Sequence, residues 1–472
     1  MTPWSGRRLH FVGIGGAGMS GLALVARQLG AQVTGSDRAE SSYSKRLREA
    51  GIEPVIGHDA ASLPDGADVV VSTAIPETNP ELERARERGL RVLHRGDLLA
   101  EVAALKRSIA VAGAHGKTTT TGMLAHVLRA TGRDPAFVMG GELREAGTNA
   151  TWGHGDWIVV EADESDRSFL KLDPDVAVVT NIELDHHTTY ASETELSAAF
   201  DEFAAKAESV IAWKEAALAA DARRFGIGCG DMRAEEVELL PGGSRFFVAG
   251  SARGSEAAGA AAGSAGAAEA SGSATDVLDE LRVPVELRVP GEHNVLNALA
   301  ALAAAEVAGV SVADAAPSLS GFGGAGRRFE ARGLTASGAR VFDDYAHHPT
   351  EVRATLEAAK TLGGNRVVAV FQPHLYSRTQ HLAKRFGSAL AVADESVVVD
   401  IYPARERAED FPGVTGYLVA AAAAHAAHGR RVWWIPSMDE AAELLARELR
   451  DGDVLLTLGA GNVDTLASRL TS

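Results

Sequence analysis

The sequence has very little cysteine: Cys229 is the only one in 472 residues. A single cysteine cannot form an internal disulfide bond, which fits a reducing compartment. No apolar run approaches the roughly 20 residues that cross a bilayer, and no signal-peptide core precedes the first expected strand. We therefore expect a cytoplasmic protein without a membrane partner. The Ala-rich stretch 417–427 is interpreted as a helix packed on a sheet.

Positive charge is also scarce, since 46 Lys and Arg stand against 63 Asp and Glu, a formal net charge of -17. Such a surface repels polyanions, so we expect no nucleic-acid partner. A phosphate ligand must instead be held by local cations, helix ends and metal ions. The hydrophobic share of 46% is typical of a folded globular protein. The length exceeds that of one core and predicts about three domains.

The most informative stretch is SIAVAGAHGKTTTT, residues 108–121. A predicted buried strand leads into a glycine turn, Lys117 and Thr118, and a helix-forming run follows at 123–130. Backbone N–H groups, the helix dipole and the lysine together form an anion site, and Thr118 is placed to bind Mg2+. Val111 stands where the strict P-loop pattern has glycine. The alternative is a tight turn with a chance lysine, but strand and helix both lie where phosphate binding needs them.

The N-terminal region has the pattern of a dinucleotide-binding fold. A strand at 9–14 ends in the turn GIGGAG, a helical pattern covers 19–29, and a second strand at 31–36 ends at Asp37. This fingerprint fits NAD or another diphosphate. Strands and helices keep alternating, which predicts a Rossmann-like domain over residues 1–105.

We expect two further α/β domains, a central P-loop ATPase-type domain over 106–324 and a C-terminal, doubly wound Rossmann-like domain over 325–472. The predicted central strands at 157–161 and 176–180 end in polar residues, where open α/β sheets collect ligand groups. Residues 249–274 are almost entirely Gly, Ala and Ser. This composition predicts a flexible surface insert.

Polar segments follow both central strands. In EADESD, residues 161–166, most carboxylates fit a solvated acidic turn, but Glu161 ends its strand and can face a Mg2+ ion held by Thr118. In TNIELDHH, residues 180–187, His186 is either a structural histidine or a ligand of a second metal ion or a partner of the transferred phosphate.

Two segments later in the chain can also be interpreted as either structural or ligand-binding. Asn294 and Asn297 share one helix face, and either one of them caps the helix or their amides read a base. Arg327 offers a guanidinium to phosphate, unless GRRF holds only a solvated basic pair. The segments DDYAHHP at 343–349 and FQPHLYSRT at 371–379 both lie between a strand and a helix. Such polar loops at one sheet edge indicate a ligand site.

In chain order, the sequence resembles the Mur ligases of peptidoglycan synthesis through GIGGAGMSG, VAGAHGKTTTT, EADESDRSFL, TNIELDHHTTY, VPGEHNVLNA, GAGRRFE, DDYAHHPTEV, FQPHLYSRT and LTLGAGN. The segments run from Gly13 to Asn462, nearly the whole chain. The resemblance implies an ATP- and Mg2+-dependent ligase that joins L-alanine to the lactyl carboxylate of UDP-N-acetylmuramate through an acyl phosphate. It implies a monomer or weak homodimer.

The resemblance also implies residue roles, and it assigns the first glycine turn to UDP rather than NAD. ATP would contact Gly113, Ala114, His115, Gly116, Lys117, Thr118, Thr119, Asn294, Arg327 and Asp344. The UDP-sugar would contact Gly15, Gly16, Gly18, Ser20, Asp37, Ser72, Arg95, His186, Tyr345 and His347. Two Mg2+ ions would lie at Thr118 with Glu161 and near His186. Lys117, His348 and Arg378 would carry the chemistry, with His348 as the base for the amine.

Some features depart from the family pattern. Leu375 stands where many relatives have Arg, the insert at 249–274 has no family role, and Lys206 is no convincing counterpart of the carbamoylated lysine of sister ligases. Three rival functions remain: an NAD-dependent oxidoreductase, a ligase that attaches a recycled tripeptide to the same sugar, and a nucleotide-binding regulator. The Lys117 loop disfavours the first, GIGGAGMSG and FQPHLYSRT disfavour the second, and the expected metal ligands disfavour the third.

Overall fold

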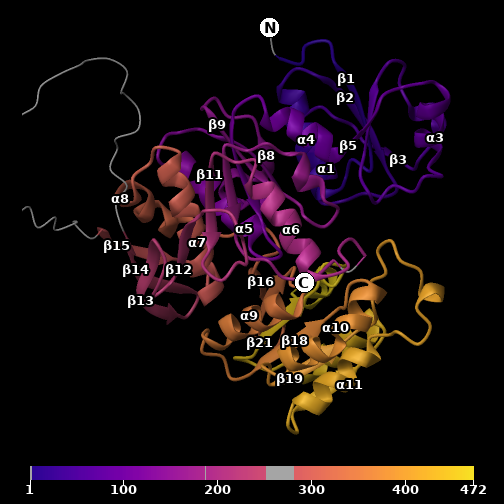
Figure 1. Ribbon diagram of the computed structural model, residues 1–472. Coiled ribbons are helices and arrows are strands. Elements are labelled where there is room, and N and C mark those ends of the chain that lie inside the picture. The colour runs from indigo at the N-terminus through magenta and orange to yellow at the C-terminus, as the bar shows by residue number, and fades with distance from the viewer. Residues whose placement is uncertain (1–2, 187, 251–280, 472) are drawn as a thin grey trace, which may run out of the picture.

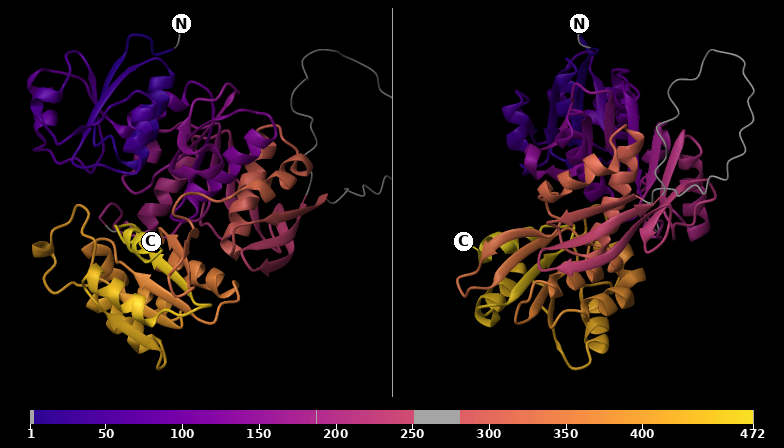
Figure 2. Two further views of the ribbon diagram at one scale, coloured as in Figure 1. Left: turned by 180° about the vertical axis from the view of Figure 1, so that it is seen from behind. Right: turned by 90° about the vertical axis from the view of Figure 1, so that its left-hand side faces the viewer.

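The computed structural model of the protein describes residues 3–186, 188–250 and 281–471. The chain forms three α/β domains, each around its own sheet, and the central domain lies between the first and the third (Figures 1 and 2). Within the described ranges no helix is both long and apolar enough to cross a membrane.

The first domain is a parallel five-stranded sheet in the order β3-β2-β1-β4-β5. Its strands are β1 (Arg8–Val12), β2 (Gln32–Asp37), β3 (Val55–Ile56), β4 (Asp68–Val71) and β5 (Val92–His94), and its helices are α1 (Ala17–Gln28), α2 (Ser44–Glu49), α3 (Pro80–Glu87) and α4 (Arg95–Ala103). The glycine turn lies between β1 and α1, as the sequence predicts. Gly13 has φ +81°, a backbone conformation that favours glycine.

The central domain holds a ten-stranded sheet in the order β15-β14-β13-β12-β11-β10-β6-β9-β7-β8. Its elements are β6 (Arg107–Ala112), α5 (Lys117–Ala130), β7 (Ala136–Leu143), β8 (Thr148–Thr151), β9 (Trp157–Glu161), β10 (Val176–Val179), α6 (Glu193–Ala204), β11 (Ser209–Trp213), β12 (Arg223–Ile227), β13 (Met232–Leu240), β14 (Gly243–Gly250), β15 (Leu281–Leu287), α7 (Glu292–Val307) and α8 (Val312–Ala315). Strands β9, β6 and β10 are parallel neighbours, so their polar carboxyl ends meet at one edge.

Two features of this domain differ from the sequence expectation. Helix α5 begins at Lys117, before the expected run at 123–130, because the glycine turn leads directly into it. Strand β14 extends to Gly250 and pairs antiparallel with β13 and β15, so the expected start of the insert at Ala249 is wrong. Backbone pairing on both sides fixes that residue. From residue 251 onward the expected insert lies outside the described residues.

The third domain is a six-stranded sheet in the order β16-β17-β21-β18-β19-β20. Its elements are β16 (Glu330–Leu334), β17 (Arg340–Asp344), α9 (Pro349–Lys360), β18 (Val367–Phe371), α10 (Tyr376–Leu390), β19 (Glu395–Val398), α11 (Tyr417–Ala426), β20 (Arg431–Trp434), α12 (Met438–Glu448), β21 (Val454–Leu458) and α13 (Asp464–Leu470). The expected doubly wound sheet is confirmed, with β16 added antiparallel at one edge.

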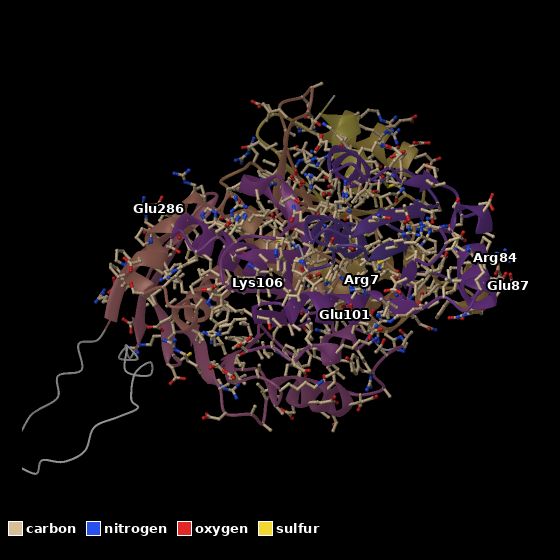
Figure 3. All side chains as sticks on the ribbon, turned by 90° about the horizontal axis from the view of Figure 1, so that it is seen from above. Arg7, Arg84, Glu87, Glu101, Lys106 and Glu286 are labelled. Atoms are coloured by element: carbon tan, nitrogen blue, oxygen red, sulfur yellow. The ribbon has the colours of Figure 1, made fainter. Side chains whose placement is uncertain are left out.

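Core packing fixes the position of the central strand edge. Leu124 of α5 and Leu299 of α7 are fully buried in one apolar cluster with strand residues such as Val111. Charged side chains such as the Arg84–Glu87 pair, 3.0 Å apart, stand at the rim of the molecule (Figure 3). The loop that precedes α5 therefore rests on a rigid core.

Replacing Leu124 with Ala should destabilise the central domain by about 2–5 kcal/mol, because truncation leaves a cavity in a packed core. The matched control is Leu239→Ala in β13 of the same domain, where the side chain is 41% exposed and the cost should stay within about 0.5 kcal/mol. Urea unfolding followed by tryptophan fluorescence measures both. Equal midpoints for the two variants would contradict this packing.

Candidate active site

The loop between β6 and α5 requires glycine at two positions. Gly113 has φ +140°, and a Cβ there would clash with the hydroxyl of Thr180; Gly116 has φ +80°, and a Cβ there would clash with the side chain of Asn297. With no side chain at either position, the backbone can approach a ligand closely at the positive end of the α5 dipole. This cradle fits a phosphate group.

The side chains that open α5 point toward carboxylates. Lys117 Nζ lies 2.8 Å from Glu164 Oε2, and both groups are largely buried. Burial lowers the pKa of Lys117, but nearby carboxylates, Glu164 first, raise it above its usual value. Thr118 Oγ1 donates to Glu161 Oε1 at 3.0 Å, and the N–H of Gly140 donates to Glu161 Oε2 at 2.7 Å. The expected pair of Mg2+ ligands therefore lies together, and its oxygen donors suit that ion.

The acidic segment after β9 is not a solvated turn, so that interpretation is wrong for three of its carboxylates. Glu164 is buried between Lys117 and His186, whose Nε2 lies 3.4 Å from Glu164 Oε1. Asp163 and Asp166 lie 2.6 Å and 3.0 Å from the guanidinium of Arg95. Glu164 thus joins the phosphate loop to His186.

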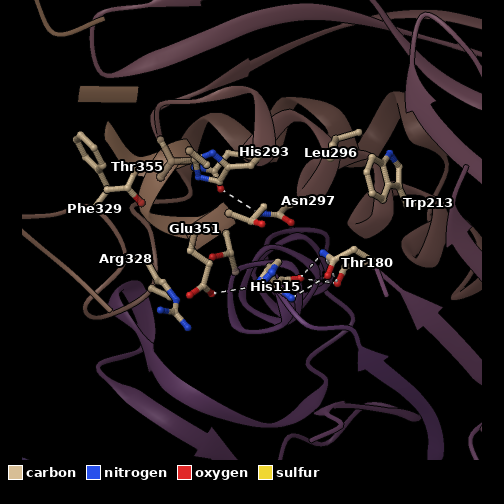
Figure 4. Close-up of a pocket in the computed structure, with 18 of the residues that line it drawn as sticks. His115, Thr180, Trp213, His293, Leu296, Asn297, Arg328, Phe329, Glu351 and Thr355 are labelled. Carbon is tan, nitrogen blue, oxygen red and sulfur yellow. Dashed lines mark hydrogen bonds and ion pairs between the residues drawn. The ribbon is translucent and has the colours of Figure 1, made fainter. Parts of the chain in front are cut away.

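A cavity of about 390 Å³ opens beside the phosphate loop, between the central and third domains (Figure 4). Its apolar wall includes Trp213, Phe225, Leu296 and Phe329. The polar lining includes His115, Asn294, Asn297, Arg328, Asp344 and Glu351. A mostly apolar wall with a few polar groups is typical of a small-molecule site, and this one adjoins the phosphate cradle.

The structure decides whether Asn294 or Asn297 caps helix α7. Gly291 caps α7, so neither Asn294 nor Asn297 is its N-cap. Asn294 Nδ2 instead donates to the carbonyl of Pro290, and Asn297 Nδ2 donates to Asn294 Oδ1 at 3.1 Å. Burial raises the pKa of Asp344 to about 6, although its carboxylate accepts two backbone N–H groups.

The two arginines of GRRF are placed differently from each other. Arg327 Nε donates to Asp343 Oδ2 at 2.9 Å, and its other nitrogens donate to the carbonyls of Gly459 and Gly461. Arg328 lines the cavity, with its guanidinium 5.0 Å from the centre of the Tyr345 ring. Contact between Arg327 and ATP stays a prediction, and Arg328 is an additional candidate.

A buried ion pair crosses from the central to the third domain. Arg378 donates to both oxygens of Asp185, at 2.6 Å and 3.0 Å, and both side chains are less than 5% exposed. His347 Nε2 lies 4.0 Å from Asp185 Oδ2. Burial lowers the pKa of His347 to about 4, so its imidazole is neutral at pH 7.

A second cluster crosses the same interface between the central and third domains, which we call the seam. His115 Nε2 lies 3.0 Å from Glu183 Oε2, and its ring stacks on that of His348 with centroids 4.6 Å apart. Burial lowers the pKa of His348 to about 3, which keeps it neutral. Burial also opposes charge on His115, but Glu183 and Glu351 raise its pKa to about 9.

In the first domain, the predicted residues surround the glycine turn. Asp37 Oδ2 accepts the N–H of Gly15 at 2.8 Å, and a side chain at Gly15 would collide with Asp37 and Ser41. Ser20 is buried against Asn149 of β8.

The other predicted residues of this domain lie in a loop and at helix α1. Ser72 accepts the N–H of Ala74 in the loop after β4. Gly16 caps α1, and Gly18 lies in its first turn beside Arg95.

The structure brings into the site four residues for which the sequence predicts no role, namely Glu183, Asp185, Arg328 and Glu351. Glu183 and Asp185 lie in the polar segment TNIELDHH after β10. Glu351 follows His348 by three residues, the spacing of a capping box, and the structure contains that box. Spacing could therefore have indicated Glu351. By contrast, Glu183 pairs with His115 and Thr350, 68 and 167 residues away, and Asp185 pairs with Arg378, 193 residues away.

Family models match the chain in three consecutive parts. The Mur ligase family catalytic domain matches residues 8–107, the Mur ligase middle domain matches residues 111–305, and the Mur ligase glutamate ligase domain matches residues 327–461.

Individual relatives match over almost the full chain. The UDP-N-acetylmuramate–L-alanine ligase of Streptomyces coelicolor is 45% identical, covering 98% of this chain and 96% of that protein. The enzyme of the same name from Mycolicibacterium smegmatis is 46% identical, covering 99% and 95%. The crystal structure of UDP-N-acetylmuramate-alanine ligase MurC from Thermotoga maritima is similar at a TM-score of 0.80, with 29% identity and 98% coverage of both chains.

A murein peptide ligase, Mpl, from Psychrobacter arcticus is also similar, at a TM-score of 0.70 and 26% identity over 98% of both chains. The three family models follow the order of the three sheets, and the relatives cover the chain from end to end. The chain therefore belongs to the Mur ligase family.

Proposed function

We propose that this protein joins L-alanine to the lactyl carboxylate of UDP-N-acetylmuramate, with conversion of ATP to ADP and phosphate, in cytoplasmic peptidoglycan synthesis. One observation carries the proposal. At the seam, the phosphate-binding loop and the oxygen ligands of Thr118 and Glu161 lie on one side, and the buried Arg378 lies on the other with uncharged histidines. Relatives that are 45–46% identical over almost their whole length bear the name of this activity. An oxidoreductase or a regulator needs no such combination.

We assign ATP to the cradle and the adjoining cavity. Backbone N–H groups at the start of α5 and the ammonium of Lys117 hold its phosphates, and the apolar wall with Trp213 and Phe225 takes its base. Thr118 and Glu161 would hold one Mg2+ ion, and His186 with Glu164 would hold a second. Bound Mg2+ supplies positive charge to the phosphoryl oxygens.

The first step is attack of the lactyl carboxylate on the γ-phosphate of ATP, which gives an acyl phosphate and ADP. In the free protein the ammonium of Lys117 is paired with Glu164, so an incoming phosphate competes with that carboxylate for it. Lys117 then offsets negative charge on the transferred group, and positioning supplies most of the rate. Closure of the seam excludes water from the acyl phosphate.

The second step is attack of the amine of L-alanine on the acyl phosphate, with loss of phosphate. The amine must be neutral, and we assign His348 to accept its proton because this imidazole lies beside the phosphate loop, stacked on His115. We place Arg378, Tyr345 and His347 near the lactyl carboxylate and L-alanine, with Tyr345 and His347 also contacting the UDP-sugar. The glycine turn of the first domain holds the UDP diphosphate, with Arg95 joining that domain to the central one.

The reaction is tested by ADP release with ATP, Mg2+, UDP-N-acetylmuramate and L-alanine, followed by omission of each component in turn. We expect ADP only when the sugar nucleotide and L-alanine are both present. Turnover with the tripeptide but not with alanine would move the assignment to the recycling ligase. Nucleotide binding without any ADP release would favour the regulator.

Lys117→Ala should lower turnover by about a hundredfold or more, the scale for loss of one group that stabilises transition-state charge. The control is Lys45→Ala, because the side chain of Lys45 is 85% exposed on α2. Steady-state ADP release gives the rates, and circular dichroism checks that both variants fold. Full activity in the Lys117 variant would remove this loop from the mechanism.

Asp185→Asn should raise the KM for L-alanine about tenfold or more while leaving the KM for ATP within about twofold, since each factor of ten corresponds to about 1.4 kcal/mol. The reason is that Asp185 holds Arg378 in place from the neighbouring domain. Asp173→Asn is the control, because that side chain is 82% exposed. An equal rise in the KM of every substrate would argue against a specific effect on the amino-acid site.

A further inference from the structure

One cluster at the seam has the composition of a transition-metal site. Among the described residues, His115, Glu183 and His348 form a group in which one donor atom from each lies within 4.8 Å of the other two. His115 and Glu183 belong to the central domain, and His348 caps α9 of the third. The cluster is separate from Thr118 and Glu161, whose donors are oxygen atoms.

The distances within the cluster resemble those around a bound ion. His115 Nε2 lies 3.0 Å and His348 Nδ1 lies 3.8 Å from the same oxygen, Glu183 Oε2. Two ligands of a tetrahedral zinc ion, with bonds of about 2.1 Å, lie about 3.4 Å apart. The His115–Glu183 and His348–Glu183 distances lie on either side of this value, and all three donors lie within 4.8 Å of one another, so a bound ion would draw the donors together.

The surroundings supply the outer contacts that such a site needs. His115 Nδ1 lies 3.4 Å from Glu351 Oε1 (Figure 4). A carboxylate on the far nitrogen of a ligating histidine fixes its orientation. Glu183 also accepts a hydrogen bond from the hydroxyl of Thr350 at 2.7 Å, which fixes its carboxylate.

His348 provides a second, independent observation. Its side chain is fully buried, and its Nε2 has no hydrogen-bond partner within the described part of the chain. Its Nδ1 accepts a long contact, 3.4 Å, from the N–H of Thr350 and caps the start of α9. The Nδ1 atom near Glu183 is therefore held by a weak contact that an ion could replace.

We propose that His115, Glu183 and His348 bind a divalent transition-metal ion of the Zn2+ class, and that the bound ion inhibits the enzyme. Two imidazole nitrogens and one carboxylate suit Zn2+, Co2+ or Ni2+, whereas Mg2+ prefers oxygen ligands in an octahedral arrangement. Coordination by His115 releases to solvent the proton that this imidazole carries beside Glu183 and Glu351. A tetrahedral ion would take its fourth ligand from water.

Inhibition follows from where the ligands lie, and this part of the proposal rests on the proposed ligase function. An ion bound to His348 removes the lone pair that would accept the proton of the amine. The same ion ties the central domain to the third, which opposes release of products from the closed seam. Binding itself does not depend on which reaction the protein catalyses.

To test binding, the full-length protein is first freed of transition metals, and CoCl2 is then added in the presence of excess Mg2+. Tetrahedral Co2+ absorbs in the visible range, so coordination is observed without any assay of activity. We expect about one Co2+ per chain, and at least tenfold weaker binding in Glu183→Gln and in His348→Asn. Excess ZnSO4 should displace the Co2+ spectrum.

Two control variants locate the ion. His154→Asn removes an imidazole that is 98% exposed and should leave Co2+ binding unchanged. His186→Asn removes the histidine assigned to the second Mg2+ ion and should also leave it unchanged. Loss of Co2+ binding in the His186 variant but not in Glu183→Gln would place the ion at the Mg2+ site and overturn the proposal, as would the absence of a visible spectrum in the unaltered protein.

The inhibitory part is tested by ADP release in excess Mg2+ with increasing ZnSO4. We expect Zn2+ to inhibit over the concentration range in which it displaces Co2+, and Glu183→Gln to shift that range upward at least tenfold. Displacement of Co2+ without inhibition would overturn this part alone. If no substrate mixture releases ADP while Co2+ still binds, the ligase function fails and the metal site stands. Circular dichroism checks the folding of each variant, and Glu183→Gln keeps the shape of the native side chain.

Discussion

The buried ion pair between Asp185 and Arg378 sets how the third domain stands over the phosphate loop. Asp185 follows β10 and Arg378 lies in the first turn of α10, so the pair links the polar edges of two sheets. Removing one partner of such a pair costs about 3–5 kcal/mol, because the other charge stays buried. The imidazoles of His347 and His374 beside this pair add no charge, since burial lowers the pKa of His347 to about 4 and that of His374 to about 2.

An uncommon backbone conformation at Leu375 sets the direction of the Arg378 side chain. Leu375, which precedes α10, has φ +71°, a region that side chains other than glycine rarely adopt. Its N–H donates to the carbonyl of Tyr402 at 3.0 Å, and this contact holds the turn. Strain of this kind persists where the surrounding structure enforces it, often at functional sites. In this protein it starts α10 where Arg378 meets Asp185 and His374.

Local pattern predicted the three sheets and much of the site. Glycine turns, apolar runs and polar residues at strand ends identified β1, β6, β9 and β10, and they placed Thr118 beside Glu161. The antiparallel strands β13 and β14 lead into no ligand-binding turn and were not predicted. Partners such as Arg95 with Asp163 depend on docking between domains, which no spacing along the chain encodes. For the same reason the acidic turn was interpreted as solvated, although Glu164 is buried there.

Division of the site between domains has a chemical consequence. An acyl phosphate hydrolyses in water, so it must form only where the amine can reach it before water does. Lys117 and Glu161 come from the central domain, and Arg378 and His348 come from the third. Asp185 binds Arg378, and Glu183 lies beside His348. These two carboxylates therefore position the groups of the third domain against those of the central domain. Because these contacts form only when the domains dock, the proposed amino-acid site would assemble in the same event that excludes water.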